Sequence, residues 1–169
     1  MDPQLSSMIV SLEETENITA CLSGLMTETS ASYVMLIERS GQTIAYQTSV
    51  DDESKQVLGA LLAGSFASSR EIAKVLREKD FRTLIQQGKY ESIFAELVGD
   101  SWILVVIYHK PTTLGMVQIF SNRVVEKLAE IQIRVKKQSR STKISVFSGM
   151  MKAGEVSDTV DLLFKDLAS

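Results

Sequence analysis

The sequence predicts an α/β protein, an α+β sandwich in which helices cover both faces of a sheet. The first observation is the run 102–108, which is hydrophobic at every position, as is typical of a central strand covered on both sides. The second is the pairing of β-rich runs around short turns that contain glycine. The third is a set of segments with apolar residues at helical spacing. The expected order is helix, two strands, long helix, three strands, helix and a C-terminal tail.

The first helix is expected over residues 12–29, with acidic residues near its N-terminal end, where the helix dipole favours them. Its apolar positions are Leu12, Ile18, Cys21, Leu22, Leu25 and Met26. The position of Cys21 on this face favours a buried small hydrophobic residue over a reactive thiol. The β-rich runs 33–37 and 43–47 follow, and Gly41 between them supplies a positive φ, so they are expected to form a hairpin.

A long helix is expected over residues 52–80, with Asp51 or Asp52 as its N-cap. One face is an apolar stripe expected to lie on the core, made of Val57, Leu61, Phe66, Ile72, Val75 and Leu76. Another face has almost no side chains and is made of Ala60, Ala63, Gly64, Ala67 and Ser68. Because glycine costs roughly 1 kcal/mol relative to alanine inside a helix, Gly59 and Gly64 are expected at close contacts. The pattern leaves open whether these contacts are with the chain's own sheet or with a partner.

Strands are expected over residues 81–86 and 90–98 around Gly88, and Gly99 then turns the chain into the central strand 102–108. A third helix is expected from about Leu114, capped by Thr112 or Thr113. Its expected buried positions are Met116, Val117, Ile119, Phe120, Val124, Leu128, Ile131 and Val135. The stretch 123–143 is rich in Lys and Arg; a solvated helix face is the favoured interpretation, and a surface for an acidic partner stays open.

The chain is expected to divide into a domain over residues 1–138 and a flexible linker with a short C-terminal amphipathic helix over 139–169. The linker, 139–154, is rich in Ser, Lys and Gly. The apolar face of the terminal helix includes Val160, Leu163, Phe164 and Leu167. A helix of about a dozen residues is marginal alone, so this face is expected to dock, either on the same domain or in the groove of a partner.

Composition and motifs exclude several function classes. The formal net charge of -3 argues against nucleic-acid binding, and no apolar run approaches the ~20 residues of a membrane helix. A single cysteine precludes an internal disulfide, so a cytoplasmic protein is expected. No Gly-rich phosphate loop or paired cysteine is present, and His109 is the one histidine. We therefore expect no catalytic residues, no cofactor and no metal site, and regard an enzyme as improbable.

Three segments carry a resemblance to a known family: LIERSGQTIAYQ, LGALLAGSFASSREIAKVLREKDF and VGDSWILVVIYHKPTTLGMVQI. Together with the order of elements, they resemble a Roadblock/LC7 domain over residues 8–128, and within that superfamily they are most similar to the MglB group, bacterial partners of the Ras-like polarity GTPase MglA. The terminal EVSDTVDLLF resembles the acidic C-terminal helix of some members. Phe66, Arg70 and Glu71 depart from the pattern, because relatives tend to have small residues there.

The resemblance implies a five-stranded antiparallel sheet, with the long helix on one face and the first and third helices on the other. It also implies a homodimer that pairs through the long helix and the third strand. The dimer interface would include Leu58, Leu62, Phe66, Phe81, Thr83 and Ile85. A GTPase would bind the small-residue face, at Ala60, Ala63, Gly64, Ala67, Ser68 and Glu71.

The implied activity is that of a GTPase-activating regulator in cell polarity or motility, concentrated at a cell pole through its partners. It would reshape the switch region of the GTPase without an arginine finger, and the C-terminal helix would aid nucleotide exchange. The alternative is a non-catalytic Roadblock scaffold dimer for signalling or motility complexes.

Overall fold

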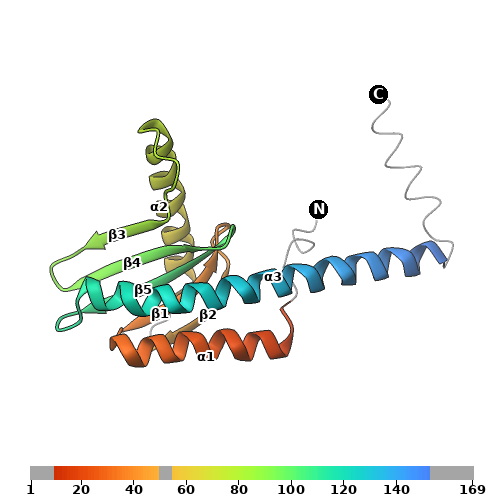
Figure 1. Cartoon of the computed structure of the whole chain (residues 1–169), viewed down its shortest axis with the longest axis horizontal. Coiled ribbons are helices and arrows are strands. Elements are labelled where there is room, and N and C mark those ends of the chain that lie inside the picture. Colours follow the sequence, from red (N-terminus) through yellow and green to blue (C-terminus); the bar gives the residue numbers. More distant parts are fainter. Residues whose placement is uncertain (1–9, 50–54, 153–169) are drawn as a thin grey trace. The chain divides into compact units, whose positions relative to one another are not determined.

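The structure, a computed structural model, describes residues 10–49 and 55–152. The chain forms two compact units, one comprising Ser11–Gln132 and one whose described part is Val10 and 133–152. The elements in chain order are α1 (Leu12–Thr29), β1 (Tyr33–Glu38), β2 (Thr43–Thr48), α2 (Lys55–Val75), β3 (Thr83–Gln87), β4 (Glu91–Val98), β5 (Trp102–His109) and α3 (Leu114–Lys152) (Figure 1). This is the predicted order of helices and strands.

The strands form one five-stranded antiparallel sheet in the order β2-β1-β5-β4-β3, as predicted. The hydrophobic strand β5 lies at its centre, between β1 and β4, and seven of its eight residues are buried. Gly41 and Gly99 adopt positive φ angles of 95° and 59° in the turns before β2 and β5. The edges of the sheet are β2 and β3.

Helices cover both faces of this sheet (Figure 1). On one face, Leu62, Ala63 and Phe66 of α2 pack in a core cluster with alternate residues of the central strands. These strand residues are Tyr33, Met35, Ile37, Ala95, Ile103, Val105 and Ile107. The intervening strand residues point to the opposite face, which α1 and the first part of α3 cover. The predicted division of the helices between the two faces is therefore confirmed.

The helix caps follow ordinary capping chemistry. Helix α1 has the predicted bounds, and Ser11 caps it by accepting a hydrogen bond from the Glu14 amide at 3.3 Å. Thr113 caps α3 through the Met116 amide, also at 3.3 Å. Thr112 has a different role, because its hydroxyl donates to the Thr29 carbonyl oxygen at 2.6 Å and so joins the end of α1 to the start of α3.

The prediction for the buried face of α2 is wrong. Of the six residues of the apolar stripe only Phe66 is buried; the other five are exposed. Phe66 follows Val57 by about two and a half helical turns, which places the two on opposite sides of the helix. The helix lies on the sheet through Phe66, Leu62 and small residues, among them Gly59, Ala63 and Ala73. It also ends earlier than predicted, at Val75, and the proposed caps Asp51 and Asp52 lie outside the described residues.

Glycine at position 59 permits a close approach between α2 and the β1–β2 hairpin. A Cβ atom there would lie 2.9 Å from Thr43 Oγ1 and 3.2 Å from the Gly41 carbonyl oxygen. A Cβ atom at Gly64 would meet nothing within 4 Å. The predicted close contact is therefore confirmed within the subunit for Gly59 but not for Gly64.

The prediction that Met116 and Ile119 of α3 are buried is wrong. Both side chains are exposed, while Ser121, Val125 and Gln132 are buried. Gln132 holds the β4–β5 turn, since its side chain donates to the Val98 carbonyl oxygen and accepts from the Asp100 amide, both at 3.3 Å.

The segment predicted as a linker is helical as far as Lys152. The rest of the tail lies outside the described residues, and it includes the predicted docking residues Val160, Leu163, Phe164 and Leu167.

Candidate functional site

The exposed side of α2 is the most prominent candidate surface, and we call it the α2 outer face. Val57, Leu61 and Ile72 are 63%, 65% and 61% exposed on it, although all three are large and apolar. Small or polar residues complete the face: Ala60, Gly64, Ala67, Ser68 and Glu71. Three exposed large apolar residues on one side of a helix make this face a candidate interaction site.

The structure brings together five of the six predicted GTPase-binding residues. Ala60, Gly64, Ala67, Ser68 and Glu71 are all exposed on the α2 outer face. Ala63 is only 3% exposed and belongs to the core cluster against the sheet. Its side chain is therefore directed at the subunit's own core.

The six predicted dimer residues do not form one surface. Leu62 and Phe66 are buried in the core cluster, and Leu58 and Phe81 are partly buried against it, with the Phe66 and Phe81 rings 5.1 Å apart. Thr83 and Ile85 lie on β3, where they pair with Glu96 and Phe94. These positions alternate with Leu84, which packs on the α2 side, so Thr83 and Ile85 belong to the opposite face of the sheet.

Strand β3 is nevertheless a candidate for pairing between subunits. It is the last strand of the sheet, and within the described chain no further strand lies on its outer side. Backbone donors and acceptors on an open edge can pair with a strand of another chain. The α2 outer face and the β3 edge are thus two candidate contact surfaces of the same unit.

Arg70 is only half-exposed on α2. Its Nη1 atom is buried and has no hydrogen-bond partner among the described residues. At 100° per residue, Arg70 follows Ala63 by seven positions and therefore lies close to the buried side of the helix. Arg70 therefore lies at the border of the α2 outer face.

Other reactive groups offer little chemistry. Within residues 10–49 and 55–152, no cluster of three or more His, Cys, Asp or Glu residues is arranged to hold a metal ion. His109 is exposed at the end of β5. Burial raises the pKa of the Cys21 thiol and outweighs the nearby charge of Lys127, so the thiol stays protonated at neutral pH. None of the helices in the described parts of the chain has the length and hydropathy of a transmembrane span.

Sequence reasoning missed two features of this unit. One is the apolar ridge of the α2 outer face, which had been assigned to the core. The other is Glu96, whose side chain is nearly buried on the α3 side of β4. The alternation of Phe94, Glu96 and Val98 places a carboxylate between two apolar residues on one face, and this was the signal available in the sequence.

Comparisons with known proteins agree with this architecture. The family model of the Roadblock/LC7 domain matches residues 11–108. The structure is similar to Myxococcus xanthus MglB, with 27% identity, a TM-score of 0.70, and 75% of this chain and 96% of that chain covered. For the gliding protein MglB of Thermus thermophilus the identity is 27%, the TM-score 0.69, and the covered shares 78% and 97%. For an MglB with a tetrameric arrangement they are 25%, 0.72, 80% and 99%.

No curated protein sequence gives a significant match. The family match nevertheless extends over more than half of the chain, from α1 to the central strand β5. The order of helices and strands, the antiparallel sheet and the matched residues all agree, so the chain belongs to the Roadblock/LC7 family.

Proposed function

We propose that the protein is a homodimeric regulator of a small Ras-like GTPase of the MglA type and stimulates GTP hydrolysis by that partner. The observation that carries this proposal is the exposed α2 outer face, together with the open edge of β3, in a Roadblock/LC7 chain similar to MglB proteins. Both surfaces are suited to binding other chains, and the protein regulates chemistry that takes place on the GTPase.

The α2 outer face has two ridges, and we assign each ridge to a different partner. Val57, Leu61 and Ile72 project on one side and offer apolar side chains to a dimer interface. Ala60, Ala67 and Glu71 recur at spacings of seven and four and lie on the adjacent side of the helix. In our proposal the apolar ridge faces a second copy of the chain, and the small ridge lets the GTPase approach the helix backbone.

In the proposed dimer a two-fold axis relates the subunits, and the outer edge of β3 pairs with the outer edge of β3 in the second subunit. Pairing would extend the sheet across the dimer and would satisfy backbone groups that an isolated subunit leaves open. Leu62 and Phe66 contribute indirectly. They lie in the core, where they hold α2 on the sheet and so determine the position of both ridges.

Stimulation in this proposal uses no arginine finger. A finger supplied in trans must reach the transferred phosphate, and Arg70 is only half-exposed, with one guanidinium nitrogen buried. The dimer instead binds the hydrolysis-competent conformation of the GTPase more tightly than its resting conformation. That difference in affinity shifts the population of the GTPase towards the state that hydrolyses GTP.

The test is single-turnover GTP hydrolysis by a Ras-like GTPase with and without this protein. Ala67→Arg should abolish binding of the GTPase while the dimer persists, because a long charged side chain on the small ridge holds the partner away. Leu61→Arg should instead weaken the dimer. Ser23→Arg, which adds the same side chain at an exposed position of α1, is the control and should leave both unchanged. Binding of the GTPase without faster hydrolysis would indicate the scaffold function.

A further inference from the structure

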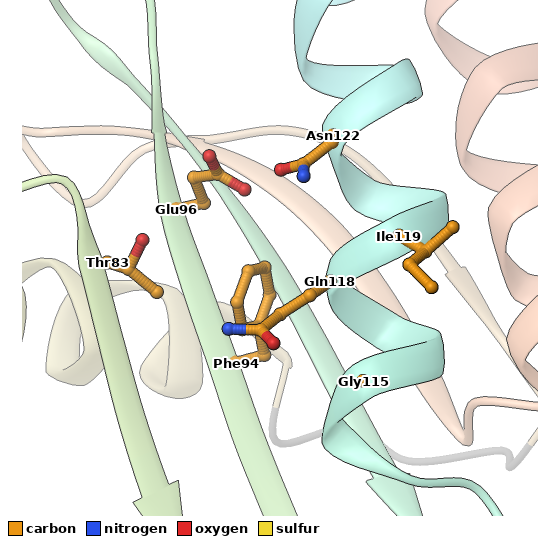
Figure 2. A pocket seen from close by; sticks show the side chains of 7 residues that line it. All are labelled: Thr83, Phe94, Glu96, Gly115, Gln118, Ile119 and Asn122. Carbon is orange, nitrogen blue, oxygen red and sulfur yellow. The ribbon is translucent and has the colours of Figure 1, made fainter.

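A second site lies on the other face of the sheet from α2. A pocket of about 490 Å³ opens between β3, β4 and the start of α3. Figure 2 shows its lining, with Thr83 on β3, Glu96 on β4 and Asn122 on α3. Its volume falls within the range of roughly 300–1,000 Å³ that is usual for ligand pockets. The pocket is separated from the α2 outer face by the sheet itself.

Glu96 is the distinctive group of this pocket. It lies in the sheet between Thr83 of β3 and Leu104 of β5, and it is 9% exposed. Its Oε2 atom is buried and accepts no hydrogen bond from any described residue. Burial raises the pKa of the Glu96 carboxyl, and the charge of Arg82 opposes this only in part. A buried carboxylate oxygen without a donor is an acceptor that a ligand can satisfy.

The other lining groups restrict the chemistry of such a ligand. The side chains of Gln118 and Asn122 come from exposed positions of α3 and can accept or donate hydrogen bonds beside the carboxylate. The buried ring of Phe94 lies at the wall of the pocket (Figure 2). A carboxylate disfavours an anion, whereas a planar guanidinium carries five donors, pairs well with a carboxylate and packs against aromatic rings.

Apolar side chains around the pocket indicate that the cation belongs to a protein segment. Ile119 lines the pocket and is 60% exposed, and Met116, one turn earlier on α3, is 41% exposed. Such residues can contact the neighbours of an inserted side chain. We propose that this pocket binds an arginine side chain of a partner protein, with Glu96 as the group that recognises its charge.

The experiment is an NMR titration of the isotope-labelled full chain. The probes are N-acetylarginine amide, N-acetylcitrulline amide, which has the same shape but no charge, and a peptide that places arginine between two leucines. The arginine amide should give saturable shifts of the side-chain amides of Gln118 and Asn122. Citrulline should bind about tenfold or more weakly, because its neutral ureido group has no positive charge to pair with the Glu96 carboxylate.

Variants separate recognition from folding. Glu96→Gln should weaken binding of the arginine amide about tenfold or more, whereas Glu126→Gln removes a charge from an exposed position of α3 and should leave binding unchanged. Asn122→Leu, at an exposed position that does not affect the core, should fill the pocket and abolish binding. Undiminished binding by Glu96→Gln and Asn122→Leu, or equal binding of citrulline, would overturn the proposal.

The peptide identifies the source of the cation. It should bind about tenfold more tightly than the single residue, and Ile119→Ser should remove that gain. Equal affinity for the peptide and the single residue would contradict a protein partner and would assign the pocket to a small free cation. None of these measurements requires the GTPase, so this proposal stands or fails independently of GTPase regulation.

Discussion

Replacing each of two glycines of α2 by alanine tests the assignment of the buried and outer faces of this helix. Both substitutions remove a glycine from a helix interior, which should stabilise the helix by about 1 kcal/mol. At Gly64 the new methyl group meets nothing within 4 Å, so the free energy of unfolding of the subunit should rise by that amount. At Gly59 it would lie 2.9 Å from Thr43 Oγ1 and 3.2 Å from the Gly41 carbonyl oxygen. Overpacking of this kind costs about 1–3 kcal/mol.

The gain in helix propensity is common to both variants, so their difference isolates the cost of the contact between α2 and the hairpin. We expect Gly64→Ala to be about 1–3 kcal/mol more stable than Gly59→Ala. Urea unfolding at a protein concentration low enough to dissociate the proposed dimer measures this difference. Equal stabilities, or destabilisation by Gly64→Ala under those conditions, would refute the orientation of the helix described above.

The remaining predictions concern catalysis, pH and the tail. Arg70→Ala should reduce stimulated GTP hydrolysis only modestly; a loss of several orders of magnitude with intact binding would establish an arginine finger. Because the folded-state pKa of Glu96 is raised, its stabilising effect is complete below the unfolded pKa and is lost as the pH rises through the folded pKa. The stability of Glu96→Gln relative to the wild type should therefore increase with pH. Urea unfolding midpoints of both proteins at several pH values measure this, and a difference between the midpoints that does not change with pH would contradict it. Deletion of residues 154–169 should slow nucleotide release from the GTPase; unchanged release would exclude a role in exchange.

The sequence predicted correctly those features of the fold that a single strand or turn determines by itself. Strand β5 is hydrophobic at both alternating sets of positions, which is sufficient to predict helices on both faces of the sheet. Gly41 and Gly99 mark turns in the sequence, and both adopt positive φ angles. These signals are local, so they can be interpreted without knowledge of the tertiary contacts.

The failures involve contacts between elements. In α2 the exposed residues Val57, Leu61 and Ile72 were assigned to the core, but Leu62, Ala63 and Phe66 occupy it, and Gly59 lies against the β1–β2 hairpin. In α3 a stretch rich in Ser, Lys and Gly was interpreted as a linker. Ser141 and Thr142 instead donate to the carbonyl oxygens of Lys137 and Gln138, one helical turn earlier, so their hydroxyls are satisfied within the helix.

The candidate site was predictable in part for the same reason. Exposure of Gly64, Ala67 and Ser68 follows from their position along a single helix. The predicted dimer residues combined α2 with β3, and the alternation of β3 directs Thr83 and Ile85 to the other face of the sheet. The pocket at Glu96 depends on how α3 crosses β4, which no local pattern specifies.

The proposed function requires the α2 outer face to bind a Ras-like GTPase and to promote hydrolysis of its GTP. The most direct measurement is the single-turnover hydrolysis rate of that GTPase with the wild-type protein and with Ala67→Arg. We predict acceleration of about tenfold or more by the wild type and by the Ser23→Arg control, and none by Ala67→Arg, whose dimer remains intact. Equal acceleration by Ala67→Arg, or tight binding of the wild type with no change in rate, would exclude this function for the α2 outer face.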